Sequence, residues 1–415
     1  MADALLGNGY LKHWEFLFGG SSVNPLAFLL PVLSLTLTAC VGPVSLHRAV
    51  IAYDETISRV EREMLLINVA RTHRGLPTHF TVTSSIAATF DYRTNTGFST
   101  SIFQTAGSNN SFDLALGASA AENPTISIVP IQGEDFTKRI LTPMDESKFE
   151  FLVFQGSPID MVMRLMARGI ELQNPDGSFQ RFILNWPAVQ EEYEEFRRRA
   201  LHIAWLNKNR KLFVGTLWYD ETLRAELAGP PSAGDLMAAL EKGYRWKRLG
   251  EGNEYGFTRR VRGRVVITNY DPKTLSDAER MELNARASAN PGNFVFVDIR
   301  PGHPGGEFPL FGAIKLQSLS EMLTFLANAV ERSPEYAVRR DPRTPAMDRN
   351  PVRTLAIEET EKEPDDRQLK VAYGGRYYSV ANTPWDREAF KLLYRLFQMT
   401  VTDVSNIGVP VTIGK

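Results

Sequence analysis

The sequence predicts an α+β protein, with an N-terminal helix and an antiparallel β-meander followed by mixed α/β modules. Two changes of hydrophobic period support this class. Between residues 49 and 72 apolar side chains recur every three or four residues, which is typical of an amphipathic helix. From residue 81 they alternate with polar side chains, which is typical of a two-faced strand. After residue 134 helical patterns with intervening strands indicate the mixed modules.

The composition is that of a folded protein without an electrostatic footprint for nucleic acid. The chain has 415 residues, of which 43% are hydrophobic and 23% are charged, and its formal charge is −1. A charge so close to zero excludes a nucleic-acid partner of the usual basic kind. The single cysteine, Cys40, excludes an internal disulfide framework and a cysteine-based metal site.

The N-terminal segment has the pattern of a secretory signal. Residues 25–39 form an uncharged run that contains Pro31 and ends in small residues before Cys40. Such a run is shorter than the roughly 20 apolar residues that a membrane-spanning helix needs, and it fits a signal-peptide core with its cleavage site. Residues 1–24 carry only Lys12 as a clear positive charge, so we expect the true start to lie downstream, at Leu17 or Val23.

The residues that end this run resemble a lipobox. Leu37, Thr38, Ala39 and Cys40 match the Leu-(Ser/Thr/Ala)-(Ala/Gly)-Cys motif of bacterial lipoproteins. The resemblance implies that Cys40 is lipidated, that cleavage occurs before it, and that the acyl chains attach the mature protein to a membrane. In the same class, Val41 after the cysteine favours the outer membrane, with the protein facing the periplasm.

The first element of the mature chain is a helix over 49–72. Its apolar seam consists of Val50, Tyr53, Ile57, Val60, Met64 and Ile67. Such a seam either packs on the helix's own domain or forms an inter-subunit contact. Gly75 and Pro77 end the segment.

Four short strands follow, at 81–93, 98–106, 112–119 and 125–131. Turns are expected at Asn95–Gly97 and at Gly107–Asn110. One interpretation is a small periplasmic sheet or half-sandwich. The other is an amphipathic hairpin, residues 79–131, that each subunit contributes to an oligomeric outer-membrane pore, since strands of about 9–11 residues suffice to cross a bilayer.

The remaining chain alternates between helices and strands. Ser157, Pro158 and Asp160 predict a capped helix start, and the helix that follows contains three methionines expected to pack in the core. Further helices are expected at 191–206, 235–243, 277–289, 319–330 and 386–399, and strands at 211–219, 255–269 and 294–299, with a hairpin at 371–380. Residues 332–368, rich in Arg, Asp, Glu and Pro, predict an extended exposed segment.

These elements suggest a domain organisation in seven parts. The parts are a signal peptide (1–39), the helix and β-meander (40–133), an α/β module (134–228), a linker (229–234), a second α/β module (235–331), the charged segment (332–368) and a C-terminal hairpin and helix (369–415).

No motif specifies a reaction, so we expect neither catalytic residues nor a cofactor. The histidines lack metal-ligand spacing, although His73 and His79 flank one turn. The basic run Arg259–Arg264 predicts a solvated strand face, with an anionic partner such as lipopolysaccharide or a sugar polymer as the alternative.

Four segments are similar to a group of uncharacterised proteobacterial lipoproteins. They are Leu65–Arg71, Pro124–Ser127, Leu141–Pro143 and Tyr377–Val380. This resemblance implies the lipoprotein class and no activity. The functional hypothesis is therefore a lipid-anchored envelope protein with a non-enzymatic scaffold or assembly role, as a homo-oligomer or within an envelope complex. The alternatives are the oligomeric pore and a hydrolase of envelope polymers.

Overall fold

The computed structural model describes residues 41–101, 111–131, 133–226, 229–249, 254–400 and 411–413, and its mixed helices and sheets confirm the α+β class. The chain divides into two compact units that meet between Val60 and Glu61. This boundary lies inside helix α2 (Val41–His73), which confirms the predicted helix and begins before its expected start. Among the described residues, every helix is too short or too polar to span a membrane.

The face that α2 buries in the second unit differs from the predicted seam. Leu65, Leu66 and Val69 are fully buried, whereas Val60, a seam residue, is 44% exposed. The buried residues Leu65, Leu66 and Val69 are therefore offset by one or two positions from the seam residues Met64 and Ile67. In this part of the helix the side chains at the offset positions are the ones that pack in the core of the second unit.

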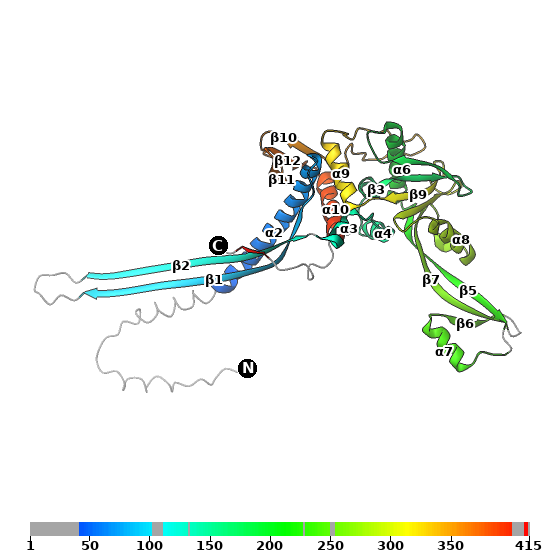
Figure 1. Cartoon of the computed structure of the whole chain (residues 1–415), viewed down its shortest axis with the longest axis horizontal. Helices are drawn as coiled ribbons and strands as arrows, with labels where there is room; N and C mark the ends of the chain where they lie inside the picture. The colour runs from blue at the N-terminus through cyan, green and yellow to red at the C-terminus, as the bar shows by residue number, and fades with distance from the viewer. Residues whose placement is uncertain are drawn as a thin grey trace, which may run out of the picture. The chain divides into compact units, whose positions relative to one another are not determined.

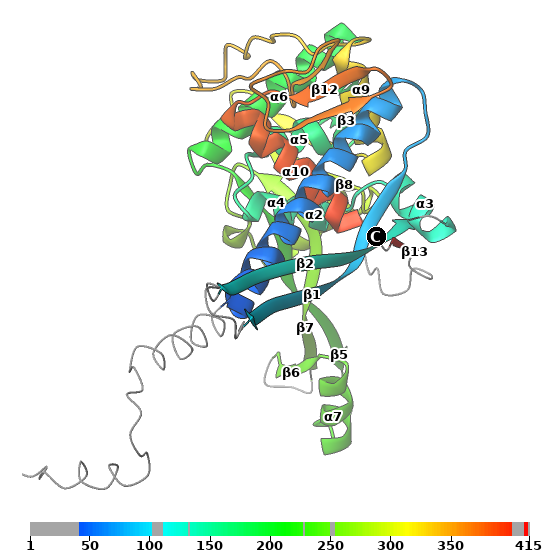
Figure 2. The same cartoon turned by 90° about the vertical axis from the view of Figure 1, so that its left-hand side faces the viewer.

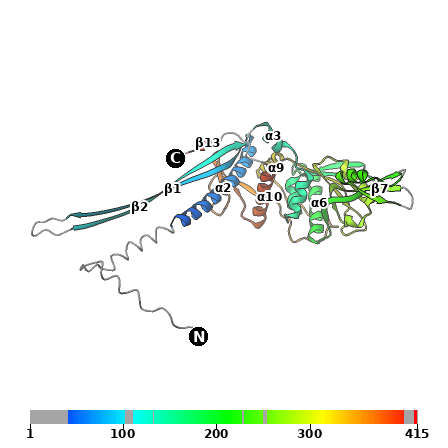
Figure 3. The ribbon, with the colours of Figure 1, turned by 90° about the horizontal axis from the view of Figure 1, so that it is seen from below.

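The predicted meander is a ribbon of two long strands, β1 (Phe80–Ser101) and β2 (Ser111–Ile131), as Figures 1 and 3 show. The strands pair antiparallel from Phe80–Ile131 to Ser101–Ser111, with one irregularity between Thr83 and Ser85. A short strand, β13 (Val411–Ile413), pairs with β2. The predicted turn at Asn95–Gly97 is wrong, because these residues continue β1 opposite Gly117, Leu116 and Ala115. The second predicted turn, 107–110, lies outside the described residues.

The core of the second unit is a seven-stranded sheet. Its main path has the order β4-β3-β9-β8-β7-β5, and β6 pairs with β7. The strands are β3 (Ala167–Gln173), β4 (Phe179–Leu184), β5 (Phe213–Glu226), β6 (Arg245–Arg248), β7 (Glu254–Thr268), β8 (Phe294–Ile299) and β9 (Leu310–Leu316). Only the β7–β8 pair is parallel. Strands of both predicted modules, 134–228 and 235–331, share this sheet, and the predicted linker 229–234 ends with the first two residues of the next helix, Ala233 and Gly234.

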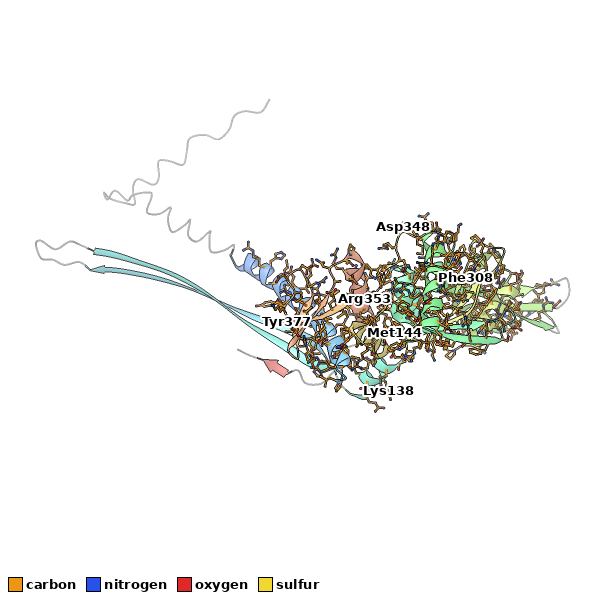
Figure 4. All side chains as sticks on the ribbon, turned by 90° about the horizontal axis from the view of Figure 1, so that it is seen from above. Lys138, Met144, Phe308, Asp348, Arg353 and Tyr377 are labelled. Carbon is orange, nitrogen blue, oxygen red and sulfur yellow. The ribbon has the colours of Figure 1, made fainter. Side chains whose placement is uncertain are left out.

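The second unit also contains these helices. They are α3 (Glu134–Leu141), α4 (Glu146–Phe154), α5 (Ile159–Met166), α6 (Gln190–Lys208), α7 (Ala233–Glu241), the 3₁₀ turn η1 (Pro272–Thr274), α8 (Asp277–Ser288), α9 (Leu319–Val330) and α10 (Pro384–Thr400). Side chains fill the interior, among them the buried Met144 (Figure 4). The three methionines of α5, at 161, 163 and 166, are buried as predicted.

The start of α5 differs from the prediction. The helix begins at Ile159 without a side-chain cap, and the buried Ser157 hydroxyl has no hydrogen-bond partner within the described part of the chain. The apolar spacing predicts a helix that continues through Ile170 to a turn at Asn174, but the helix ends at Met166 and β3 follows it directly. A continuous apolar run does not distinguish a buried helix from a buried strand, which explains the difference.

The distal part of the β5–β7 pair extends beyond the sheet (Figure 2). With β6 and α7 it forms what we call the arm, residues 219–226, 229–249 and 254–261. Helix α7 begins with a capping box, in which Ser232 accepts from the Asp235 N–H and the Asp235 carboxylate accepts from the Ser232 N–H.

Much of the segment 332–368 is exposed and has no regular secondary structure, but some of its residues are buried. Glu335, Thr344 and Thr354 are among the buried ones, and the strand β10 (Ile357–Thr360) joins a three-stranded sheet. The other strands, β11 (Lys370–Tyr373) and β12 (Arg376–Val380), are the predicted hairpin, whose turn uses Gly374 and Gly375 at positive φ. The carboxylate of Glu335 is buried because it is paired with the buried Arg164 and Arg197, as described below.

Candidate functional site

The lipobox residues Leu37, Thr38, Ala39 and the lipidation candidate Cys40 lie outside the described residues. The candidate site within the described residues is the β1–β2 ribbon and its attachment to the core.

Aromatic packing holds the root of the ribbon. Phe80 of β1 and Ile131 of β2 are register partners, and both are buried. The Phe80 ring stacks on Phe397 of α10 at 5.2 Å between centroids and meets Phe136 of α3 edge-on at 5.7 Å. Three elements distant in sequence thus fix the position at which the two strands leave the core.

A buried asparagine joins the same root to α2. The Asn68 side-chain oxygen accepts from the His79 N–H at 2.7 Å, and its amide nitrogen donates to the His79 carbonyl at 2.8 Å and to the Met64 carbonyl at 3.0 Å. The Asn68 side-chain amide therefore pairs with both backbone groups of His79, the residue before β1, as a neighbouring strand would. This pairing satisfies backbone groups that would otherwise be buried without partners.

The register of the ribbon separates two kinds of residue onto its two faces. Residues directly opposite each other in an antiparallel pair share a face, and successive residues alternate between faces. Five opposed pairs on one face contain no charged residue: Tyr92–Ala120, Thr94–Ala118, Thr96–Leu116, Phe98–Leu114 and Thr100–Phe112. The other face carries Asp91–Ala121, Arg93–Ser119, Asn95–Gly117, Gly97–Ala115 and Ser99–Asp113.

We call the uncharged set, positions 92–100 and 112–120 of that face, the apolar band. Nine residues at ~3.3 Å each cover about 30 Å along a strand, or roughly 23 Å of height at a tilt of about 40°. This height matches that of the outward apolar band of membrane-spanning strands, which is about 25 Å, and three of the ten residues of the set are threonines. Glu122, opposite Phe90, bounds the band on the side of the core.

The edges of the ribbon are open over the length of the band. Within the described parts of the chain, β13 pairs with β2 only at Ile126–Ile128, and no strand pairs with the free edge of β1. A lone two-stranded ribbon is marginally stable in water, and its unpaired edges are a template for further strands.

A buried charge cluster fixes the segment after α9. Glu335 accepts from the Thr354 N–H at 2.6 Å, from the Tyr193 hydroxyl at 2.9 Å and from Arg164 at 3.2 Å. Arg197 donates to the Tyr193 hydroxyl at 3.1 Å. Both arginines also donate to the Pro351 carbonyl, so the cluster ties α5 and α6 to the segment 335–354.

The pKa values of two groups in the cluster, Tyr193 and Arg197, are shifted by their buried surroundings. Burial and the Glu335 charge raise the pKa of Tyr193, so its hydroxyl stays protonated and donates to Glu335. Burial lowers the pKa of Arg197, with the neighbouring Arg164 acting in the same direction. The side chains of Arg164, Arg197 and Glu335 are almost fully buried, so we assign the cluster to stability.

Asp341 stabilises a turn in the same segment, 335–354. Its carboxylate accepts from the Arg343 N–H and from the Arg343 guanidinium at 2.8 and 2.9 Å, and these bonds lower the Asp341 pKa to about 2. The turn presents Thr344 to the Nδ1 atom of the buried His202, whose Nε2 atom donates to the Gly305 carbonyl at 2.8 Å. Burial lowers the pKa of His202, in agreement with a neutral ring.

Asp341→Asn should therefore lower stability in a pH-dependent way. The pKa of Asp341 in the folded protein lies below the ordinary value of 3.8. The ionised carboxylate therefore stabilises the fold at pH values above 3.8, and this stabilisation is lost as the pH falls toward about 2. The difference in free energy of unfolding between wild type and variant should be constant above about pH 5 and shrink between about pH 4 and pH 2. Urea titrations across this range measure it; a difference independent of pH would contradict the role of the ionised side chain.

The two histidines that flank the first turn have separate surroundings. The His73 ring lies within 3.0 Å of the Ala327 carbonyl and 3.1 Å of the Glu359 carboxylate, whereas His79 engages Asn68 through its backbone. No group of three His, Cys, Asp or Glu side chains suited to a metal ion occurs in the part of the chain that the structure describes.

The basic run has a divided role. Arg259, Arg260 and Arg262 are exposed as expected, but Arg264 is half-buried, bonded to both oxygens of Glu146 and to four backbone carbonyls. Arg260 and Arg262 line a groove of about 1100 Å³ between α4 and the start of β5. This groove was not predicted, because its aromatic residues, at 151, 154, 213 and 218, lie on segments that appeared to be ordinary core elements.

No protein-family model, curated protein or solved structure matches this chain. The structure itself establishes the α+β fold class, and the functional argument depends on the residues described above.

Proposed function

We propose that this protein is a lipid-anchored subunit of an oligomeric pore in the outer membrane. In this proposal Cys40 carries the anchor, the second unit is a non-enzymatic scaffold facing the periplasm, and each copy contributes its β1–β2 ribbon. The observation that carries the proposal is the register of the ribbon, which collects uncharged residues on one face over a length that fits a bilayer.

The open edges of the ribbon support an oligomer. In lipid every backbone N–H and C=O must be paired, so strands enter the hydrocarbon region only when both edges are satisfied. A ring of ribbons satisfies both edges of each ribbon, whereas a single ribbon satisfies neither. The bands would then face lipid, and Asp91, Arg93 and Asp113 would face water.

The firm attachment of the root supports the scaffold role. Phe80, Ile131 and Asn68 join the ribbon to α2, α3 and α10, so the point at which the strands leave the core is defined. A ring needs such a point, because neighbouring ribbons pair only when each copy presents its strands from the same place.

Two neighbouring residues provide a matched test. Leu116 lies in the apolar band, and Ala115 lies on the opposite face. Leu116→Arg places a charge toward lipid in every copy, at about 2–4 kcal/mol for each site near the bilayer centre, so conductance in planar bilayers should be lost. Ala115→Arg adds the same side chain to the aqueous face, so conductance should remain and shift toward anions.

Circular dichroism and the urea midpoint of the folded core serve as the folding control for both variants. Equal conductance of Leu116→Arg and wild type would contradict the proposal. Equal loss in both variants would also contradict it, because the two faces would then have no different surroundings.

A further inference from the structure

Four exposed aromatic side chains line the groove between α4 and the start of β5. Phe154 of α4 is 71% exposed and Phe151 is 51% exposed, and Phe213 and Trp218 of β5 line the same groove. Exposed apolar surface of this concentration marks a binding site more often than an ordinary surface. An occupant of the groove therefore needs an apolar part that covers these rings.

Two of the cations that line the groove already have partners. Lys148 pairs with Asp145 at 3.7 Å, and Arg280 pairs with Asp277 at 2.9 Å. These two side chains are therefore neutralised within the chain and do not select a ligand.

The two acidic side chains of the groove are engaged as well. Glu150 accepts from the Thr216 N–H at 2.7 Å and from the Thr216 hydroxyl at 2.9 Å. Asp271 accepts from the Lys273 N–H at 2.9 Å, and these two residues of one turn carry opposite charges that offset each other. Both carboxylates are thus held by groups other than the arginines of the groove.

Two arginines of the groove keep an unpaired charge. Arg260 and Arg262 are exposed, and neither forms an ion pair within the described part of the chain, although Asp220 is the register partner of Arg260. By contrast, the neighbouring Arg259 pairs with Glu221 at 2.9 Å. The groove therefore offers two cations that its own chain does not neutralise.

These two arginines and Phe213 lie at opposite ends of the groove. The guanidinium of Arg260 lies 5.7 Å from the centre of the Trp218 ring, and Arg262 is opposite Trp218 in register. Phe213 is at the start of β5, about 16 Å before Trp218 along the strand. A guanidinium stacked on a ring keeps its N–H edge available for a carboxylate or a phosphate group. The groove therefore has a cationic end and an apolar end.

We propose that this groove binds one molecule of a single-chain anionic amphiphile. The chain lies against Phe213 and against Phe154, which is beside Gly215 on the apolar side, and the anionic head contacts Arg260 and Arg262. A volume of about 1100 Å³ has room for such a molecule, because ligand pockets commonly measure ~300–1,000 Å³. The inference goes beyond the proposed pore, since it concerns the second unit and is independent of the ribbon.

Photolabelling of the full-length protein in a non-ionic detergent tests the site directly. A laurate that carries a diazirine on its chain should label the peptides that contain Phe154 and Phe213. Laurate and dodecyl phosphate, which share the chain and differ in the anionic head, should each reduce this labelling. Dodecyltrimethylammonium has the same chain with a positive head, and acetate has the head without the chain, so neither should compete at the same concentration.

Arginine variants test the anionic end. Arg260→Gln and Arg262→Gln should each raise the laurate concentration needed for half-maximal competition by roughly 10-fold, the effect of losing one charge-assisted hydrogen bond. Arg259→Gln is the matched control and should compete as wild type, because Arg259 is the next residue on the same strand and lies outside the groove.

Phenylalanine variants test the apolar end. Phe154→Ala should weaken labelling, whereas Phe179→Ala, at a 63% exposed position of β4 outside the groove, should label as wild type. The substituted side chains are exposed, so the urea midpoints should match wild type. The labelling map and the competition series use the wild type alone and test the site without any variant.

Three results would overturn the inference. They are labelling confined to peptides outside the groove, equal competition by laurate and dodecyltrimethylammonium, and equal effects of Arg259→Gln and Arg260→Gln. Leu116→Arg should be labelled as wild type, so failure of this site and failure of the pore are observed separately.

Discussion

Replacing Glu335 by glutamine should lower the free energy of unfolding by about 3–5 kcal/mol, the range found when one partner of a buried ion pair is removed. The carboxylate is the only acceptor shared by Arg164, Tyr193 and Thr354 among the bonds described above. Glutamine has the same shape, but it loses the negative charge and turns an N–H group toward donors. Arg164 and Arg197 would then lose the carboxylate with which they pair, and Asp160 would be a buried acidic group that still interacts with both.

Urea unfolding followed by tryptophan fluorescence measures this effect. Glu307→Gln, at an exposed position, is the matched control and should change stability by less than about 0.5 kcal/mol. The segment 335–354 should also become sensitive to proteolysis in Glu335→Gln, because its attachment to α5 and α6 depends on the cluster. A loss below about 1 kcal/mol would show that apolar packing holds the segment instead.

Cys40→Ser should abolish acylation and release from membranes those copies whose ribbons have not inserted. A multiply acylated cysteine gains ~0.8 kcal/mol for each buried CH₂ group, whereas a serine offers no thiol for the lipid. Incorporation of labelled palmitate and the distribution between membrane and soluble fractions measure the two effects. Ser45→Ala, five residues further on, is the control and should be acylated as wild type.

Ribbons that have already inserted would oppose this release, so a second variant is needed. Cys40→Ser combined with Leu116→Arg removes both attachments and should appear in the soluble fraction. If the double variant stays with the membrane, neither the lipidated cysteine nor the ribbon is the membrane attachment.

The sequence predicted those helices and strands that are determined by neighbouring residues, through capping residues and hydrophobic spacing. The helices α8 and α9 begin at capping boxes, Ser276 with Glu279 and Ser318 with Glu321, and their apolar spacing is that of a helix packed on one side. The strand β8 was expected over its observed residues because a short run of β-branched and aromatic residues favours a buried strand.

Features that depend on distant partners could not be predicted. Glu335 looks like a solvated charge until Arg164 and Tyr193, more than 140 residues away in sequence, are placed beside it. In the same way Asn95 and Gly97 suggest a turn, and only pairing with the whole length of β2 keeps them in a strand. The amphipathic hairpin was foreseen from its alternation, but its open edges and the groove beside α4 were not.

The most direct test of the pore is the side on which each residue of β2 lies in the assembled protein. Single cysteines placed in turn at positions 112–120 would carry an environment-sensitive fluorophore, read with one quencher in the lipid and one in water. We expect a period of two, in which Phe112, Leu114, Leu116, Ala118 and Ala120 respond to the lipid quencher and the positions between them respond to the aqueous one. A uniform response along the strand, with no alternation, would contradict the proposal.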